Sequence, residues 1–308
     1  MVNSGEPFAI VDIGSNTVKL TVFVCDDDGQ PRSIHHESDT VRIGHGVSAS
    51  GLISASRVTR LLDCLRRMET DARLHGSNDF LAVGTQAFRQ ATNGTQVRDM
   101  ILAQTRWSLE IINGNEEARL TLEGARGFLD AGRLTVIADV GGASTEIVVL
   151  SPSGAMTSGG SVPVGSGSVF DDRIKACPPP AGTLAAATKE AMIRFRESGL
   201  LSSPVDVLLL PGGTGNLLRK LLTTIVPAAA LDRSGLALLH TWLATDDGTT
   251  TAARLAIQVE RAQVLPASLA IVESLVELLA PEEIKAIPSG VGHGIAQMVC
   301  ADRWPMSS

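Results

Sequence analysis

The stretches AIVDIGSNTVKLTVFV, residues 9–24, and VIADVGGASTEIVVLS, residues 136–151, share one pattern of residues. Each consists of an apolar strand, an Asp-x-Gly, a turn of small residues and a second strand rich in β-branched residues. Two such strands around a short glycine-containing turn predict a β-hairpin. Because the same hairpin occurs twice, the sequence indicates an internal duplication in which each half builds the same kind of domain.

The segments around each hairpin alternate between strand and helix periodicity, which is typical of an α/β fold. We expect two domains, residues 1–116 and 117–308, with a last helix that packs back on the first domain. The first domain has expected strands at 8–11, 18–25, 34–43, 80–83 and 109–112, and helices at 54–76 and 96–107. The second has expected strands at 134–139, 146–150, 205–210 and 284–287, and helices at 116–129, 217–222, 234–244, 252–262, 268–279 and after Gly294.

The composition excludes several classes of protein. Of the 308 residues, 44% are hydrophobic and 19% charged, which indicates a folded globular chain. The net charge of −7, the 3% aromatic content and the absence of Tyr argue against a nucleic-acid partner. The apolar run 264–280 is short and interrupted by Pro266 and Glu273, so we expect no membrane span.

Cysteine placement and the first residues bear on the compartment. Cys25, Cys64, Cys177 and Cys300 lie far apart and form no C-x-x-C pair, so neither a zinc site nor a disulfide framework is expected. The opening residues lack the basic and apolar regions of a signal peptide. We therefore expect a cytoplasmic protein with reduced thiols.

The two hairpin turns predict a phosphate-binding site. Small residues let the backbone approach a ligand, and the N–H groups of a tight turn form an anion-binding nest. Carboxylates at the strand ends could hold Mg²⁺, which prefers oxygen ligands and phosphate partners. A single Asp-x-Gly would be an ordinary turn, but two in matching context favour phosphate. The candidates are Gly14, Ser15, Asn16, Thr17, Gly141, Gly142, Ala143, Ser144 and Thr145 for phosphate, and Asp12, Asp139 and Glu146 for the metal.

Two further segments carry candidate chemistry. In GTQAFR, residues 84–89, Thr85 and Arg89 could reach a phosphate, although a helix cap and an exposed Arg explain them equally well. In NGNEEAR, residues 113–119, acidic residues open a helix. They could simply complement the helix dipole, or one of them could orient and deprotonate an attacking water.

Taken together, these motifs resemble the exopolyphosphatase/guanosine pentaphosphate phosphatase family, a branch of the actin-like ATPase superfamily. The matching segments are DIGSNT (12–17), RIGHGV (42–47), GLIS (51–54), VGTQAFRQATN (83–93), INGNEEARL (112–120), DVGGASTE (139–146) and VPVG (162–165). The resemblance implies two actin-like, ribonuclease-H-like domains, each a mixed sheet with flanking helices, and an active site in the inter-domain cleft. It also implies that Glu117 is the catalytic carboxylate, that Mg²⁺ or Mn²⁺ is the cofactor, and that the protein is a homodimer.

One element departs from the family pattern. Members usually carry Gly-Leu-Arg-Glu-Gly near the end of the second domain, and this chain has Gly290-Val-Gly-His-Gly294 there. His293 is a poor substitute for a permanent cation.

The expected activity is release of orthophosphate from inorganic polyphosphate. The alternatives are guanosine pentaphosphate hydrolysis, with the Gly-rich segment 212–216 at the base, a nucleotide-dependent kinase, and a non-catalytic binding protein.

Overall fold

The computed structural model describes residues 5–201 and 204–304. The chain forms two compact units: unit 1 comprises Met1–Gly124 and Gly290–Ser308, and unit 2 comprises Ala125–Ser289. The division falls after Gly124, later than the boundary expected at Glu116. The reason is that helix α5 (Gly114–Ala125) begins in unit 1 and packs there through buried Leu120.

Unit 1 is built on a five-stranded mixed sheet of order β3-β2-β1-β4-β5. The strands β1, β2 and β3 are antiparallel, and β4 and β5 run parallel to β1. Parallel strands end at the same edge of a sheet, so the residues after β1 and after β4 become neighbours. The strands are β1 (Phe8–Ile13), β2 (Val18–Cys25), β3 (Pro31–Asp39), β4 (Asp79–Gly84) and β5 (Ser108–Ile111).

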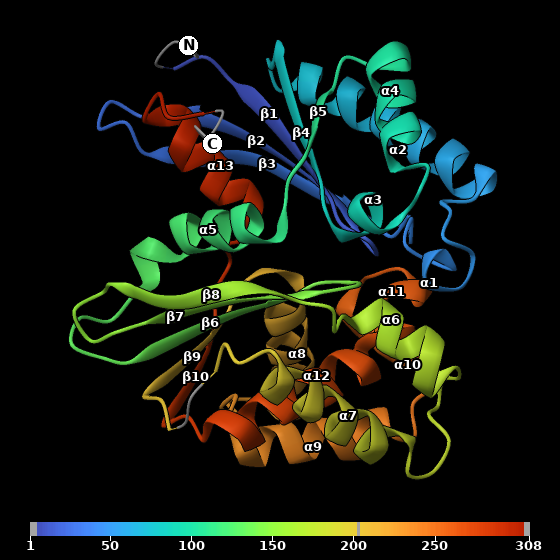
Figure 1. Ribbon diagram of the computed structural model, residues 1–308, viewed down its shortest axis with the longest axis vertical. Coiled ribbons are helices and arrows are strands. Elements are labelled where there is room, and N and C mark those ends of the chain that lie inside the picture. Colours follow the sequence, from blue (N-terminus) through green and yellow to red (C-terminus); the bar gives the residue numbers. More distant parts are fainter. Residues whose placement is uncertain (1–4, 202–203, 305–308) are drawn as a thin grey trace. The chain divides into compact units, whose positions relative to one another are not determined.

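Unit 2 repeats this sheet. Its order β10-β9-β6-β7-β8 becomes the order of unit 1 when it is read from the other edge, again with an antiparallel meander followed by parallel strands. The duplication predicted from the two hairpins is therefore present in the topology of both sheets (Figure 1). The strands are β6 (Thr135–Val140), β7 (Thr145–Leu150), β8 (Met156–Val162), β9 (Val207–Leu210) and β10 (Glu283–Ala286).

Strand β1 is buried on both faces, and alternate residues belong to different cores. Ala9, Val11 and Ile13 pack under the helices α2 and α4, whereas Phe8 and Ile10 pack under α13. Because both faces are buried, the strand is apolar at every position except Asp12, near its end. The helices of unit 1 are α1 (Val47–Ser50), α2 (Ala55–Leu74), α3 (Gln86–Gln90), α4 (Gly94–Gln104) and α5, together with α13 (Val291–Cys300) from the end of the chain.

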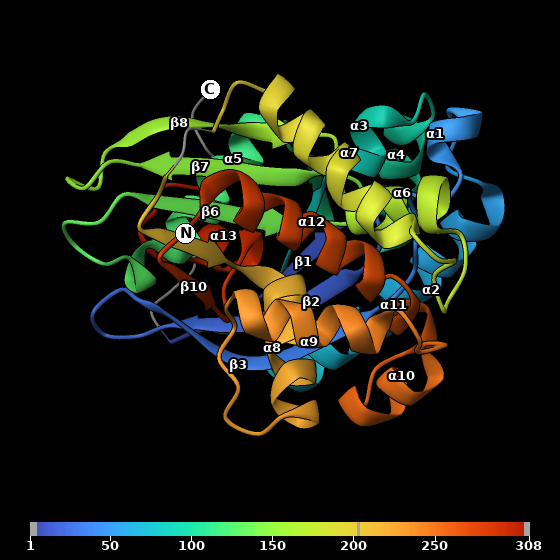
Figure 2. The ribbon, with the colours of Figure 1, turned by 90° about the horizontal axis from the view of Figure 1, so that it is seen from below.

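Unit 2 packs its longer helices around α12, which lies against α7 and α9 (Figure 2). The segment Val259–Leu279 is long and apolar enough to cross a membrane, yet 78% of it is buried within the protein, as in a core helix. The helices of unit 2 are α6 (Ser166–Val169), α7 (Thr183–Glu197), α8 (Gly212–Ile225), α9 (Arg233–Leu243), α10 (Thr249–Leu255), α11 (Val259–Gln263) and α12 (Leu265–Leu279); short turns of other helix types are Arg126–Phe128 and Phe170–Ile174.

The structure corrects several expected elements. The third strand ends at Asp39 because the following residues leave the sheet to pack on the first hairpin turn. The helix expected at 252–262 is broken into α10 and α11 by Ala256, whose φ is +53°. Strand β8 and helix α7 were not predicted, because β8 is rich in Gly and Ser and the buried face of α7 includes the small residues Ala187, Thr188 and Ala191.

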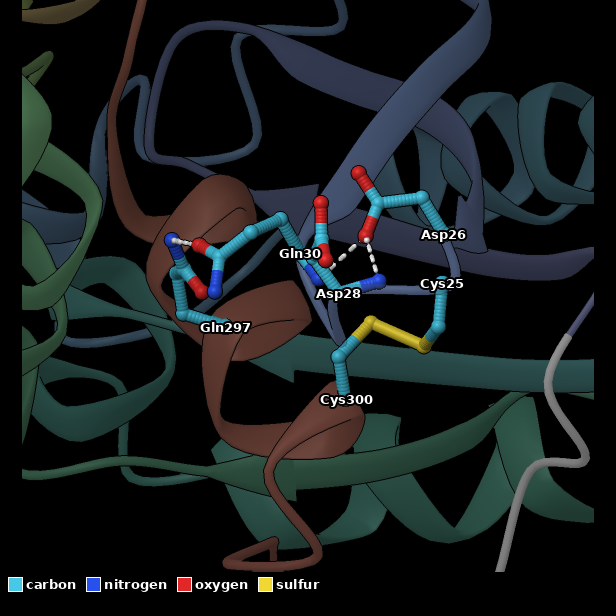
Figure 3. The surroundings of a disulfide bond; sticks show 6 residues. All are labelled: Cys25, Asp26, Asp28, Gln30, Gln297 and Cys300. Atoms are coloured by element: carbon cyan, nitrogen blue, oxygen red, sulfur yellow. Dashed lines mark hydrogen bonds between the residues drawn. A yellow bond between two sulfur atoms is a disulfide. The ribbon is translucent and has the colours of Figure 1, made fainter.

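The expectation that no cysteines pair was wrong. Cys25, at the end of β2, and Cys300, at the end of α13, form a disulfide with a Cα–Cα distance of 5.5 Å. Figure 3 shows the bond beside the hydrogen bond from Gln297 to Gln30 (3.2 Å). Sequence spacing gave no indication of it, because 275 residues separate two cysteines that only the return of α13 to unit 1 brings together. Cys64 and Cys177 are reduced.

Candidate active site

The first turn (residues 14–17) joins β1 to β2 at the end of the sheet. The backbone N–H of Gly14 donates to the carbonyl of Thr17 (3.1 Å), which closes the turn. A neighbouring loop covers it, since the N–H groups of Arg42 and Gly44 donate to the carbonyls of Asn16 and Ser15. Gly44 is required for this approach, because a Cβ there would lie 2.8 Å from the Cβ of Ser15. The RIGHGV segment therefore supports the turn.

Two side chains of this turn each carry a buried polar atom without a partner in the described residues. Ser15 Oγ and Asn16 Oδ1 are buried and have no hydrogen-bond partner within the described part of the chain. Buried polar atoms in folded proteins nearly always have a partner, so an orphaned pair marks a place where a ligand or an ordered water completes the bonding. A ligand that donates or coordinates at both atoms fits this turn.

Thr85 and Arg89 follow β4, at the same edge of the sheet. Thr85 Oγ1 donates to the carbonyl of Ile13 (3.3 Å), directly before the first turn, and Thr85 is buried. The guanidinium of Arg89 makes four hydrogen bonds within unit 1: two to Gln86, one to the carbonyl of Ile112 and one to Glu117. A guanidinium has five N–H donors, so these bonds leave one. The bidentate phosphate contact expected of Arg89 is therefore occupied within the protein.

The structure gives the two adjacent glutamates different roles. Glu116 belongs to a capping box: its Oε2 accepts from the N–H of Asn113 (2.7 Å), and Asn113 Oδ1 accepts from the N–H of Glu116 (3.0 Å). Glu117 instead points inward, is only 5% exposed, and its Oε2 accepts from Arg89 Nη1 at 2.7 Å. The helix-start explanation that the sequence allowed for both acids thus holds for Glu116 alone.

The second turn (residues 141–144) has the same construction as the first. The N–H of Gly141 donates to the carbonyl of Ser144 (2.9 Å), and a second segment again covers the turn through bonds from Ser166 and Gly167 to the carbonyls of Gly141 and Gly142. Gly165 lies so close that a Cβ there would be 2.3 Å from the nitrogen of Ala143. The VPVG segment is the counterpart of RIGHGV in unit 2.

Asp139 and Glu146 are directly opposite in the β6–β7 ladder, so their carboxylates share one face of the sheet. At the matching place of unit 1, Asp12 is opposite Lys19, and the two form an ion pair at 3.4 Å. The duplication has thus placed an acid opposite a lysine in unit 1 and two acids opposite each other in unit 2.

Hydroxyl groups fix the orientation of the second acidic pair. Glu146 Oε1 accepts from Ser144 Oγ (2.7 Å) and from Ser161 Oγ (2.8 Å). Ser161 was not a candidate, because it lies on β8, a strand the sequence did not predict. Thr145 differs from expectation: it is fully buried and its hydroxyl donates to the carbonyl of Val164 (2.6 Å), so it supports the turn rather than a phosphate.

The predicted metal ligands do not form a closed cage. In residues 5–201 and 204–304, no group of three or more His, Cys, Asp or Glu side chains is arranged to hold a metal ion. Asp12 belongs to unit 1 with Lys19, which leaves Asp139 and Glu146 as an adjacent pair of hard oxygen ligands in unit 2. Mg²⁺ is commonly held by one or two carboxylates, with waters and substrate phosphates completing its shell, so this pair fits it.

Comparison with known proteins identifies the family. The model of the Ppx/GppA phosphatase family matches residues 22–299. The chain belongs to this family. It is 27% identical to exopolyphosphatase 1 of Mycobacterium leprae over 93% of this chain and 87% of that protein. It is 30% identical to the guanosine-5'-triphosphate,3'-diphosphate pyrophosphatase of Aeromonas hydrophila over 46% of this chain and 28% of that protein. The fold matches the crystal structure of an exopolyphosphatase from Cytophaga hutchinsonii (TM-score 0.86, 18% identity, 96% of this chain and 98% of that one).

Membership of the Ppx/GppA family makes this chain a phosphoanhydride hydrolase with two domains of actin-like fold. One segment assigned from the sequence needs correction. Residues 212–216 form the first turns of α8. Thr214 Oγ1 donates to the carbonyl of Val140, and Asn216 Nδ2 donates to the carbonyls of Gly212 and Ile287. Since these side-chain donors are bonded within unit 2, the segment packs α8 on the sheet and does not present an open loop to a base.

His293, in the element where this chain departs from the Ppx/GppA pattern, is the third residue of α13. Its ring meets Phe23 edge-on, with centroids 5.3 Å apart. Burial, with smaller contributions from His36 and Lys19, lowers the pKa of His293 to about 4. The imidazole is therefore neutral at physiological pH and supplies no cation. It takes part in the packing of α13 on unit 1.

The lowered pKa of His293 predicts an acid-sensitive fold. A histidine titrates near 6.5 in the unfolded chain, so between about pH 6.5 and 4 the unfolded state binds the extra proton. The stability that depends on neutral His293 is complete above pH 6.5 and is lost as the pH falls toward 4, by up to about 3 kcal/mol. Urea unfolding at pH 7 and pH 4.5 measures this loss. His293→Gln should show a smaller loss than the parent protein; an equal loss would assign the acid sensitivity to other groups.

Proposed function

We propose that this protein releases orthophosphate from the end of inorganic polyphosphate, with Mg²⁺ as cofactor and Glu117 as the base. One observation carries the proposal: the buried carboxylate of Glu117 is held at 2.7 Å by Arg89, on the same unit as a turn with two orphaned buried polar atoms. A carboxylate held in one orientation can act as the base that activates water, provided that the substrate phosphate binds within its reach. The name of the Mycobacterium leprae relative supports polyphosphate as the substrate.

The reaction consists of one displacement. Glu117 orients a water molecule and accepts its proton as the water oxygen bonds to the terminal phosphorus. The bridging P–O bond breaks, orthophosphate departs, and the electron pair of that bond stays on the shortened chain. Phosphoryl transfer needs positioning and charge stabilisation more than covalent chemistry. When bound, Mg²⁺ neutralises phosphate charge, and Asp139 and Glu146 are the residues that would hold it.

The two turns bind and orient phosphate groups. In the first turn, Ser15 Oγ would donate to a phosphate oxygen, whereas Asn16 Oδ1, which can only accept, would face a donor or cation that accompanies the phosphate; Gly14 and Thr17 shape the backbone. In the second turn, Gly141, Gly142 and Ala143 provide a backbone that a phosphate can approach closely. The hydroxyl of Ser144 donates to Glu146 Oε1, so its role is to hold the Glu146 carboxylate in place.

Phosphate release from long-chain polyphosphate tests the proposal. We expect release with Mg²⁺ and its loss when EDTA removes the metal. The same protein is assayed with guanosine pentaphosphate and, for the kinase alternative, with ATP and a range of acceptors. Cleavage of guanosine pentaphosphate without release from polyphosphate would overturn the substrate assignment. Binding of polyphosphate by folded protein without any release would favour the non-catalytic alternative.

A further inference from the structure

The guanidinium of Arg89 is held along both of its edges. On one edge, Gln86 Oε1 accepts from Nε (3.1 Å) and from Nη2 (2.9 Å). On the other edge, Nη1 donates to the carbonyl of Ile112 (2.8 Å) and to Glu117 Oε2 (2.7 Å). A guanidinium is planar and rigid, so fixing one edge determines where the other edge points.

We infer that Gln86 is a positioning residue. By holding the guanidinium of Arg89, it fixes the position of the Glu117 carboxylate and leaves the positive charge of Arg89 to pair with that carboxylate. The inference rests on the proposed function of Glu117. Gln86 is the first residue of α3, and its side chain is partly buried beside Arg89, which is 18% exposed. Its amide oxygen holds the guanidinium without adding charge.

The neutrality of Gln86 matters because Arg89 carries one positive charge, and Glu117 is the carboxylate it pairs with among its four bonds. A second carboxylate at position 86 would accept the same two N–H bonds but would compete for that charge and repel Glu117. Repulsion by a nearby like charge favours the protonated form of a carboxyl group. A protonated Glu117 cannot accept a proton from water, so an acid at position 86 should move activity to higher pH.

Two substitutions separate geometry from charge. Gln86→Met keeps the length of the side chain and removes the acceptor, and it should lower kcat by roughly 10- to 100-fold, since small misplacements of catalytic groups cost about that much. KM should change by less than about threefold if Gln86 acts through Arg89 and not on the substrate itself. Gln86→Glu restores the acceptor, so most of the rate should return. In the plot of kcat/KM against pH, the fall in activity on the acidic side should move to higher pH.

The chain supplies a matched control. Gln90 lies on the same short helix, is exposed, and its Nε2 donates to Ser48 Oγ (3.3 Å), away from Arg89. Gln90→Met should retain the parent rate within about twofold. The inference is overturned if Gln86→Met keeps kcat within about twofold of the parent, or if Gln86→Glu is as slow as Gln86→Met with an unmoved acidic limb.

The contact between Gln86 and Arg89 can also be tested by thermal unfolding, which needs no enzymatic turnover. Thermal unfolding of Gln86→Met, Arg89→Lys and the double variant forms a mutant cycle. If the two side chains are coupled, the fall in Tm of the double variant is smaller than the sum of the single falls; additive falls would overturn the coupling. The cycle can be read even if the parent protein releases no phosphate from polyphosphate, in which case the proposed function fails and the Gln86–Arg89 coupling is still tested.

Discussion

Glu117→Gln should lower kcat for phosphate release by between about 10²- and 10⁴-fold, the range that a general base contributes. The glutamine amide keeps the size of the side chain. Its oxygen can still accept the hydrogen bond that Arg89 Nη1 donates to Glu117 Oε2 at 2.7 Å in the parent protein. It loses the capacity to accept a proton from water. Steady-state phosphate release at saturating polyphosphate measures the effect, and circular dichroism establishes that the variant is folded.

Glu116→Gln is the matched control for this substitution. Glu116 is the neighbouring acid, and its carboxylate accepts the N–H of Asn113 in the capping box that starts α5. Glutamine also serves in a capping box, so we expect a change in stability of well under 1 kcal/mol and a kcat close to that of the parent. If Glu116→Gln were inactive and Glu117→Gln active, the assignment of Glu117 as the base would be wrong.

Removal of the Cys25–Cys300 disulfide should cause the largest loss of stability among these variants. A covalent link over a sequence separation of 275 residues strongly restricts the unfolded chain, and loss of a native disulfide costs about 2–5 kcal/mol. Cys300→Ser should therefore unfold at lower urea concentration than the oxidised parent. The loss acts on α13, whose residues Val291, Ile295 and Val299 complete a core cluster of unit 1.

Reduction provides an internal control for the disulfide. A reductant should lower the unfolding midpoint of the parent toward that of Cys300→Ser and leave the variant unchanged. Titration of thiols in denaturant should find two in the oxidised parent, Cys64 and Cys177, and four after reduction. Four thiols before reduction, together with equal stabilities of parent and variant, would contradict the bond.

The disulfide also bears on the position of Glu117. Gly294 of α13 lies so close to α5 that a Cβ there would be 1.9 Å from the carbonyl oxygen of Leu120. Leu120 lies one turn after Glu117 on α5. The helix that the disulfide holds to unit 1 therefore packs directly on the helix that carries the proposed base.

Much of the fold could be predicted from the sequence because the relevant signals are local. The apolar strands around Asp12 and Asp139, the small-residue turns and the helical spacing of α2 are all set within a few residues. The repetition of one hairpin was enough to predict that two similar sheets form. A strand was missed where Gly and Ser replace the β-branched residues that mark a strand, as in β8.

The candidate site was only partly predictable. The sequence singled out the residue types at both turns and the pair Glu116 and Glu117, because these are determined by motif. It did not indicate which glutamate caps α5 and which pairs with Arg89, since that choice depends on where β4 and α5 lie in space. Ser161 was missed because its partner Glu146 lies on another strand, and Gln86 was missed because its role depends on the contact of Arg89 with Glu117, which lies on another helix.

The duplicated α/β architecture could be predicted from sequence because hairpins and turns are encoded in neighbouring residues, and the phosphatase family was indicated by the resemblance of short motifs along the chain. The pairing of Cys25 with Cys300, the neutral packing of His293 and the ion pair of Arg89 with Glu117 could be seen only in the folded chain. The physical reason is the same in each case. These interactions join segments that are distant in sequence or lie on different elements, and their geometry exists only after the sheets and helices have packed.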